Sequence, residues 1–405
     1  QLLQMSGLEA LYRREQEEGG EDRLANVREL VTVATAFDEE NENATVADFL
    51  TRMALVIEQL RSLKSAVRQN EWIVSRPEQE LEGWGAPAPL PAPLPALPPA
   101  LQDAQRIDDV PRFWARTAPG ALALTDAGRP VSYRVLEDAI AETAALLRTR
   151  GVGPGDRVLV ALENGTAAVA AIFAASRLQA WPVLVNARLS EGEIDAIVRH
   201  ASPRTMLFTI EVSKEAAAHA ARWGAKAVHT ACLGRLALTE PDRDVRPEPT
   251  DRAPLVAAMI YSSGTTGAPK GVMVTHRGLL TFAGVSIRSR RLTHADCAYA
   301  ALPMSHIFGL ATQLVAMLSG GCKLYIVPRF DPREAIEALE RHGVTILQGV
   351  PTMFTRIVDA IDARGTPLVA PQLRFIYTGA APLDPTMKRR VESLFGLPLH
   401  HGYGL

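Results

Sequence analysis

The chain has 405 residues, which leaves room for two or three domains of ordinary size. Apolar residues make up 47% of it and charged residues 22%, as in globular proteins, and the net charge of −2 gives no bulk attraction for nucleic acid or an anionic membrane. The three cysteines form no Cys-x-x-Cys pair, and no apolar run reaches the roughly 18 residues of a membrane span. We therefore expect a cytoplasmic protein with neither disulfides nor a zinc site.

Residues 1–83 are polar, acidic and helical in pattern. Apolar residues recur on one helical face at Leu24, Val27, Leu30, Val31 and Ala34. A second helix is expected over residues 46–68. Residues 5–58 resemble a fragment of Rep-type superfamily-one DNA helicases, in the segments Ser6–Tyr12, Asp22–Leu30 and Ala47–Leu50. The fragment has no ATP-binding motif and no basic stripe, so we expect a helical extension that binds no nucleic acid.

A proline-rich segment follows at residues 84–102, with seven prolines among the thirteen residues 87–99. Proline removes amide donors and favours an extended polyproline conformation, so a semi-rigid linker is expected. A ligand for a proline-binding domain is the alternative. On either interpretation the segment marks a boundary, and residues 103–405 form the next domain.

From residue 103 onward, short apolar runs alternate with amphipathic helices. Strands are expected at residues 157–162, 181–185, 205–209, 255–260, 323–327, 345–348 and 374–377. One helix is opened by a capping box between Ser190 and Glu193, and others begin after Asp331 and Asp384. Strands alternating with helices predict right-handed β-α-β units. The expected fold class is therefore α/β, with parallel sheets flanked by helices.

The run from Tyr261 to Gly271 reads Tyr-Ser-Ser-Gly-Thr-Thr-Gly-Ala-Pro-Lys-Gly and follows an apolar strand. Its glycines let backbone amides approach an anion, its hydroxyls donate hydrogen bonds, and Lys270 supplies a positive charge. The residues expected to bind phosphate, besides Lys270, are Ser262, Ser263, Gly264, Thr265, Thr266 and Gly267. A flexible surface loop is the plainer alternative, but the density of donors favours a polyphosphate site. An ordinary P-loop is excluded, because Lys270 is followed by glycine rather than Ser or Thr.

This run resembles the signature of the adenylate-forming superfamily, which includes acyl-CoA synthetases, aryl-CoA ligases, luciferases and nonribosomal adenylation domains. The resemblance extends over residues 103–405. Further motifs follow in the family's order at Leu302–Leu310, Gly349–Phe354, Tyr377–Leu383 and His401–Leu405. It implies the large N-terminal domain of such an enzyme, with ATP, Mg²⁺ and coenzyme A taking part in its reaction.

The resemblance also implies roles for individual residues. Lys270 and His306 would be catalytic. Further nucleotide contacts would come from Gly379, Ala380, Ala381, Pro382, Tyr403 and Gly404. The acyl pocket would be lined by Met304, His306, Ile307, Phe308, Gly349, Val350 and Thr378. No residue is assigned to a metal, and a site at the adjacent His400 and His401 is not expected, because neighbours in an extended segment point to opposite faces.

The segment Met304–Phe308 contains no acidic residue to pair with the ammonium group of an amino acid, and an unpaired buried charge is costly. The resemblance therefore favours an uncharged carboxylic acid, and residues 349–354 are closer to fatty acyl-CoA synthetases than to aryl ligases. In the family such an acid becomes an acyl-adenylate and then an acyl-CoA. An adenylation domain that serves a carrier protein and a non-catalytic nucleotide-binding protein are the alternatives.

The chain begins at Gln1 without Met and stops at Leu405, before the family's Thr-Glu pair and small C-terminal domain. In the family those parts carry the Mg²⁺-binding glutamate, the catalytic lysine and the surface for coenzyme A. We therefore expect an incomplete large domain that binds ATP and has little activity by itself.

Overall fold

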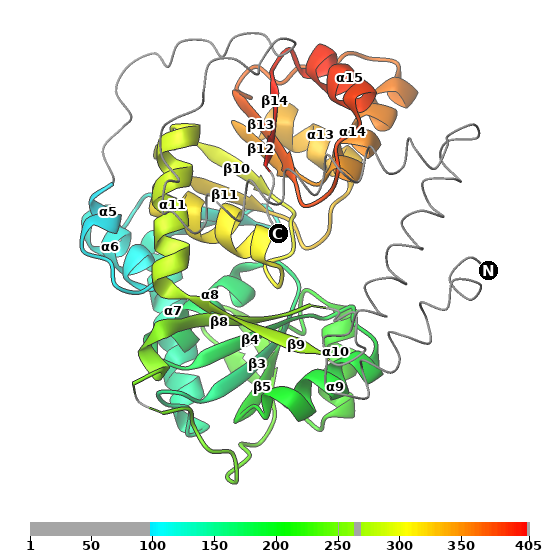
Figure 1. Ribbon diagram of the computed structural model, residues 1–405. Helices are drawn as coiled ribbons and strands as arrows, with labels where there is room; N and C mark the ends of the chain where they lie inside the picture. Colours follow the sequence, from blue (N-terminus) through cyan, green and yellow to red (C-terminus); the bar gives the residue numbers. More distant parts are fainter. Residues whose placement is uncertain (1–97, 250, 263–268, 403–405) are drawn as a thin grey trace, which may run out of the picture. The chain divides into compact units, whose positions relative to one another are not determined.

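The computed structural model describes residues 98–249, 251–262 and 269–402 (Figure 1). The chain divides into two units, residues 1–91 and 92–405, and every described residue belongs to the second. The helices expected within residues 1–83, the helicase-like segment and most of the expected linker lie outside the described residues. The end of that linker is helical rather than extended, because α5 covers Pro99–Gln102 and proline suits the first position of a helix.

One sheet, here sheet B, has the strand order β6-β7-β5-β3-β4-β8-β9. Its strands are β3 (Arg157–Leu162), β4 (Trp181–Asn186), β5 (Thr205–Phe208), β6 (Lys226–Thr230), β7 (Gly234–Leu238), β8 (Val256–Ser262) and β9 (Lys270–Thr275). The central strands β5, β3, β4 and β8 run parallel, whereas β7 and β9 run against their neighbours. Every residue of β3 is buried, as expected of a parallel strand covered on both faces.

The other sheet, sheet A, has the order β14-β13-β12-β10-β11-β1-β2. Its strands are β1 (Leu122–Asp126), β2 (Arg129–Ser132), β10 (Cys297–Ala300), β11 (Lys323–Ile326), β12 (Ile346–Gly349), β13 (Phe375–Gly379) and β14 (Leu399–Gly402). All neighbouring strands are parallel except the hairpin β1–β2.

The two sheets and the helices form five layers, with helices between the sheets and on the outer face of each. The helices packed on the outer face of sheet B are α9 (Glu191–Ala201) and α10 (Lys214–Arg222). Those that share one core with strands of both sheets are α7 (Tyr133–Thr149), α8 (Thr166–Arg177), α11 (His276–Arg290), the π-helix η2 (Gly309–Val315) and α12 (Ala316–Ser319), with α6 (Asp109–Thr117) beside them. Those on the outer face of sheet A are α13 (Pro332–Arg341), α14 (Pro351–Arg364) and α15 (Pro385–Phe395) (Figure 1). None of the helices in residues 98–249, 251–262 and 269–402 is both long and apolar enough to cross a membrane.

Local sequence signals explain where several helices begin. The predicted capping box of α9 is present, since Ser190 Oγ accepts from the Glu193 amide and the Glu193 carboxylate accepts from the Ser190 amide at 2.8 Å. Asp331 and Asp384 cap α13 and α15, each of which starts with proline. These caps satisfy amides that the first helical turn leaves free.

The predicted α/β class with parallel sheets and flanking helices is confirmed, and every strand expected from the sequence is present. The strands that were not expected are β1, β2, β6, β7, β9, β10 and β14. Most of them lie toward a sheet edge, where exposed polar residues interrupt the apolar pattern. In β6, for example, only Thr230 is fully buried.

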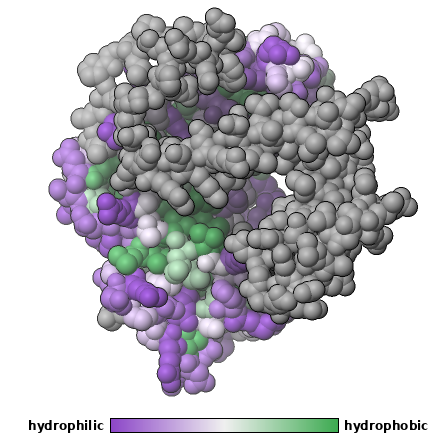
Figure 2. All heavy atoms as spheres, in the orientation of Figure 1, coloured by the Kyte–Doolittle hydropathy of each residue, from purple (hydrophilic) through white to green (hydrophobic). Residues whose placement is uncertain are grey.

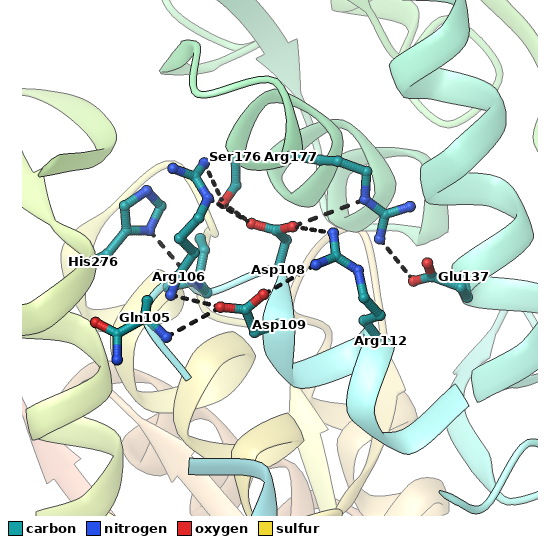
Figure 3. A network of polar contacts seen from close by, with 10 residues as sticks. Gln105, Arg106, Asp108, Asp109, Arg112, Glu137, Ser176, Arg177 and His276 are labelled. Carbon is teal, nitrogen blue, oxygen red and sulfur yellow. Dashed lines mark hydrogen bonds and ion pairs between the residues drawn. The ribbon is translucent and has the colours of Figure 1, made fainter. Parts of the chain in front are cut away.

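A buried cluster around Asp108 anchors the start of the described chain (Figure 3). The Asp108 carboxylate is 1% exposed, accepts from Ser176 Oγ of α8 at 2.6 Å, and pairs with Arg112 at 2.8 Å. Next to it, the Ile107 amide donates to Nδ1 of His276, the first residue of α11, at 3.3 Å. Burial lowers the pKa of His276 to about 4, so the imidazole is neutral. The segment before α6 is thus fixed to two central helices.

Hydrophobic side chains gather on the surface where α11 meets β9 (Figures 1 and 2). The exposed apolar residues of these two elements are Val272, Met273, Phe282 and Val285. Strand β9 is also the outer strand of sheet B. Apolar patches on edge strands favour association. We therefore expect aggregation in concentrated solution to begin at this face.

Candidate active site

The carboxyl ends of the parallel strands in sheet A form the edge at which the candidate site lies. Strand β11 pairs with one side of β10, and β12 pairs with the other. The chain continues from β10 to β11 on one side and from β12 to β13 on the other, so its connections diverge between β10 and β12. Open α/β sheets bind ligands outside the carboxyl ends of their strands at such a switch point. The residues after these strands, 301–309 and 350, are accordingly the first candidates.

A cavity of about 420 Å³ lies at this switch point, within the range of about 300–1,000 Å³ that is usual for ligand pockets. Loops of sheet A line it with Leu302, Pro303, Ser305, His306, Phe308, Gly309, Val350 and Ala380. Sheet B and α9 line it with Leu184, Val185, Asn186, Leu189, Ile197 and Tyr261. No Asp or Glu is among these described lining residues, so an ammonium group would lack a charged partner here.

The ring of His306 is oriented by its own turn. Its amide donates to the carbonyl oxygen of Pro303 at 3.0 Å, and the Phe308 amide donates to its Nδ1 at 3.2 Å. Because an amide can only donate, Nδ1 is the acceptor, and the neutral ring carries its proton on Nε2. His306 therefore offers the cavity a hydrogen-bond donor.

Aromatic side chains support this wall from sheet A. The rings of Phe308 and Tyr377 meet edge-on with centroids 6.0 Å apart, and the Arg290 guanidinium lies 4.3 Å from the Tyr377 centroid. Arg290 is 6% exposed, and its burial lowers its pKa from the ordinary value. It also donates to Gln348 Oε1 at 2.8 Å. A Cβ at Gly402 would lie 1.6 Å from the Tyr377 hydroxyl, so only glycine lets β14 pass this ring.

Strands β8 and β9 pair antiparallel, and the expected phosphate loop is the stretch of sequence that joins them. Ser262 pairs with Lys270 at the end of this strand pair, so both ends of the loop leave from one place. Residues 263–268, with the expected Ser263, Gly264, Thr265, Thr266 and Gly267, lie outside the described residues. Lys270 is exposed and does not line the cavity. The base of the loop nevertheless adjoins the cavity, because Tyr261 forms part of its wall.

Tyr261 is held by a residue that the sequence did not single out. Its hydroxyl lies 2.7 Å from Nδ1 of His200 on α9, and the two rings meet edge-on. Burial raises the pKa of Tyr261, so the hydroxyl keeps its proton. A Cβ at Gly271 would lie 3.0 Å from the Tyr261 ring. The glycine therefore makes room for Tyr261, a reason that differs from the expected approach of an anion.

The cavity brings together only part of the expected site, namely His306, Phe308, Val350 and Ala380. The other expected residues that the structure describes do not line it: Met304, Ile307, Gly349, Thr378, Gly379, Ala381 and Pro382. Met304 and Thr378 are fully buried, whereas Ile307 is 42% exposed. Successive side chains of an extended segment or tight turn point in different directions, which a motif alone does not resolve. Tyr403 and Gly404 lie outside the described residues.

Three amide side chains near the site were missed. Asn164 follows β3, Asn186 ends β4, and Gln313 lies in η2. Asn164 and Gln313 are 1% and 0% exposed, and both bond to the backbone of residues 299–304. The polar pair Glu163-Asn164 after the buried strand β3 was the available signal for Asn164, since such positions meet at the edge where ligands bind.

Neither a metal cluster nor the larger hollow beside Arg157 provides a better ligand site among the described residues. Among residues 98–249, 251–262 and 269–402, no three His, Cys, Asp or Glu side chains group as a metal site would require. A hollow of about 760 Å³ adjoins Arg157 and Arg204. Both arginines are already engaged, Arg157 with the carbonyls of Ala201 and Arg246, and Arg204 with Asp156. The two arginines are therefore held within the fold.

The two-sheet architecture has an apolar cavity beside Tyr261, where the sequence rich in Ser, Thr and Gly begins, and this combination defines the large domain of an adenylate-forming enzyme. The chain belongs to the AMP-binding enzyme family, whose model matches residues 112–405.

Known proteins similar to this chain include ligases for different acids. It is 30% identical over 290 residues to 4-coumarate–CoA ligase 5 of Oryza sativa subsp. japonica, covering 69% of this chain and 53% of that protein. It is 31% identical over 271 residues to a long-chain-fatty-acid–CoA ligase of Thermus thermophilus, covering 64% and 49%. The crystal structure of ATP-bound MatB from Rhodopseudomonas palustris matches with a TM-score of 0.58 and 26% identity, over 73% of this chain and 60% of that one. The chain spans about half the length of the curated relatives it matches.

Proposed function

We propose that this chain is the acid- and nucleotide-binding part of an acyl-CoA ligase. In the reaction, ATP converts an uncharged carboxylic acid to an acyl-adenylate, and coenzyme A converts that to an acyl-CoA. The observation that carries the proposal is the apolar cavity at the switch point, which presents the His306 donor and has no acidic lining residue. Its similarity to CoA ligases and to ATP-bound MatB supports the choice of ATP and coenzyme A.

The reaction requires two groups of residues, one at the reacting centre and one at the departing phosphates. A carboxylate oxygen bonds to the α-phosphorus of ATP while pyrophosphate leaves, and the thiolate of coenzyme A then bonds to the acyl carbon while AMP leaves. His306 Nε2 would donate to an oxygen at the reacting centre, and Lys270 with residues 262–267 would bind the departing phosphates. Such catalysis depends on positioning and on preorganised donors. Mg²⁺ would neutralise phosphate charge when bound, and we assign it no ligand among the described residues.

The acid is expected to carry a fatty tail. Residues 349–354 favour this choice, as does the similarity to a fatty-acid ligase. An aromatic acid is the second candidate, because the chain is equally similar to a coumarate ligase. The cavity volume of about 420 Å³ lies low in the usual range, which favours a short or medium chain over a long one.

The remaining parts of the proposal concern the chain as a whole. We expect a cytoplasmic protein that binds a small acid, ATP and coenzyme A, with residues 1–83 dispensable and without affinity for nucleic acid. The chain alone is expected to bind nucleotide but to turn over little. An adenylation domain that passes its acyl group to a carrier protein is the alternative within the same chemistry, and a non-catalytic nucleotide-binding protein is the alternative outside it.

Calorimetric titration with ATP and with acyl-sulfamoyladenosines tests the proposal. Octanoyl and cinnamoyl analogues should bind more tightly than the alanyl analogue, because only the last buries an ammonium group. Lys270→Ala should weaken ATP binding, and His306→Ala should weaken the acyl analogues. Lys226→Ala is the matched control, since this exposed lysine pairs with Glu240 on the far edge of sheet B. Equal affinity of all variants for ATP, or preference for the alanyl analogue, would contradict the proposal.

A further inference from the structure

The loop that carries His306 is held by side-chain amides from outside it. Leu302 has both of its backbone groups bound in this way: its carbonyl accepts from Asn164 Nδ2 at 2.9 Å, and its amide donates to Gln313 Oε1 at 3.0 Å. The Met304 amide donates to Asn164 Oδ1 at 3.0 Å. Asn164 therefore clamps the residues on both sides of Pro303.

A chain of contacts leads from this clamp to the imidazole. The Pro303 carbonyl accepts the His306 amide at 3.0 Å, and a Cβ at Gly309 would lie only 2.1 Å from the same oxygen. The backbone of His306 is thus fixed to Pro303, and the Phe308 amide then sets the ring through Nδ1. A shift of Pro303 would move the Nε2 donor with it.

Asn164 also connects the two sheets. It follows β3 of sheet B, whereas residues 302–304 follow β10 of sheet A. The cavity takes its walls from both sheets, with Asn186 and Tyr261 on one side and His306 and Phe308 on the other. Hydrogen bonds of Asn164 therefore join the carboxyl edges of the two sheets that wall the cavity.

We propose that Asn164 is a positioning residue for the acid-activating site: its amide sets the placement of His306 against the sheet-B wall, and through it the affinity for the acyl group. This inference rests on the proposed function. Because the amide is nearly fully buried and uses both its donor and its acceptor, no residue lacking either can replace it.

Asn164→Asp provides the test, because it keeps size and acceptor but loses the donor to Leu302. Asp296→Asn is the matched control. Asp296 is equally buried and bonded but precedes the same strand β10 at its opposite end. Octanoyl-sulfamoyladenosine should bind Asn164→Asp about tenfold more weakly, the order expected for one buried hydrogen bond. The control should lose thermal stability and bind the analogue within about twofold of wild type, because its contacts do not reach the cavity.

Nuclear magnetic resonance of the His306 ring nitrogens gives a second measurement that needs no ligand. Nδ1 should shift in Asn164→Asp and stay unchanged in Asp296→Asn. If Asn164→Asp fails to fold, Asn164→Ser is measured in its place. An unchanged Nδ1 signal, or an equal loss of affinity in variant and control, contradicts the proposal that Asn164 positions His306. If wild type binds no analogue, the proposed function fails, and the imidazole signal still decides whether Asn164 positions His306.

Discussion

Buried polar side chains at the two edges of sheet A differ in how they are paired. At the amino edge, the Asp296 carboxylate accepts two hydrogen bonds from Arg374, at 2.6 and 2.7 Å, and one from Thr345 Oγ1 at 2.8 Å. The Thr293 amide adds a further bond at 2.8 Å. The acceptors of Asp296 are therefore fully used within the fold.

At the carboxyl edge, donors are left open. Gln348 Nε2 and Thr378 Oγ1 are buried and have no hydrogen-bond partner among the described residues. His306 also lines the cavity, and its Nδ1 accepts from the Phe308 amide, which leaves the proton on Nε2. Buried polar groups are normally paired, so these two unpaired donors at the ends of β12 and β13 are available to a ligand. Full pairing indicates a part of the sheet that serves stability.

Removing the amino-edge carboxylate should give the largest loss of stability and no loss of binding. Asp296→Ala should lower the free energy of unfolding by about 3 kcal/mol, toward the lower end for a broken buried ion pair because Arg374 is partly exposed. Urea denaturation measures this loss, and titration with octanoyl-sulfamoyladenosine measures binding. A loss of analogue affinity at a temperature where the variant is folded would contradict the division between the edges.

The same carboxylate gives that edge a pH dependence. Burial by itself raises the pKa of Asp296, but the bonds from Arg374, Thr293 and Thr345 outweigh it and hold the pKa below the ordinary value. The stabilisation is therefore complete above about pH 4 and is lost as the pH falls through the lowered pKa of the folded state. Asp296→Ala should show a smaller loss of stability in this acid range than wild type.

A change at the carboxyl edge should reduce stability and binding together. Gly309→Ala places a methyl group 2.1 Å from the Pro303 carbonyl oxygen, a backbone atom that cannot turn away. We expect a loss of about 2–3 kcal/mol in urea denaturation, and weaker binding of the octanoyl analogue because the turn of His306 must shift. Unaltered affinity would show that the turn tolerates displacement.

Buried His276 should also make the stability of the fold depend on pH. The folded pKa of about 4 lies below the ordinary 6.5, so the unfolded chain binds a proton first. Stability should therefore fall as the pH drops from 6.5 to 4, by up to about 1.4 kcal/mol per unit. Arg106 opposes and Asp108 favours protonation. His276→Asn keeps an acceptor for the Ile107 amide and should flatten this slope in urea denaturation at pH 7 and 5. An identical slope in the variant would contradict the assignment.

The smallest effect is expected at the exposed start of α9. Gly192 lies in α9, and a Cβ there would meet nothing within 4 Å. Gly192→Ala should raise the free energy of unfolding by about 0.5–1 kcal/mol through helix propensity and leave ligand affinity unchanged. It is also the control for Gly309→Ala, since the chemical change is identical. A loss of stability would mean that α9 cannot accept the methyl group.

The sequence predicted those strands that are both buried and rich in β-branched or large apolar residues, such as β3 and β4. It missed β10, although this strand forms the switch point. Its sequence, Cys-Ala-Tyr-Ala, is fully buried, but only Tyr299 among its four residues favours a strand.

The candidate site shows a similar limit. Motifs placed His306, Phe308 and Val350 in one pocket, because residues after neighbouring parallel strands lie together. They did not predict the wall from Leu184, Ile197 and Tyr261, because that wall depends on how the two sheets are placed against each other. The roles of Asn164 and Gln313 likewise arise from contacts between distant segments.

The pairing of β1 with β11 has a consequence for how the protein is made. Leu124 lies opposite Leu324, about 200 positions later, and all of sheet B is encoded between them. A growing chain can complete sheet B first, whereas the hairpin β1–β2 must wait for its neighbour. Non-local strand pairing folds slowly, and an unpaired strand is open to wrong partners in the meantime. During synthesis on the ribosome, the β1–β2 hairpin should therefore be the last part of the early chain to reach its final position.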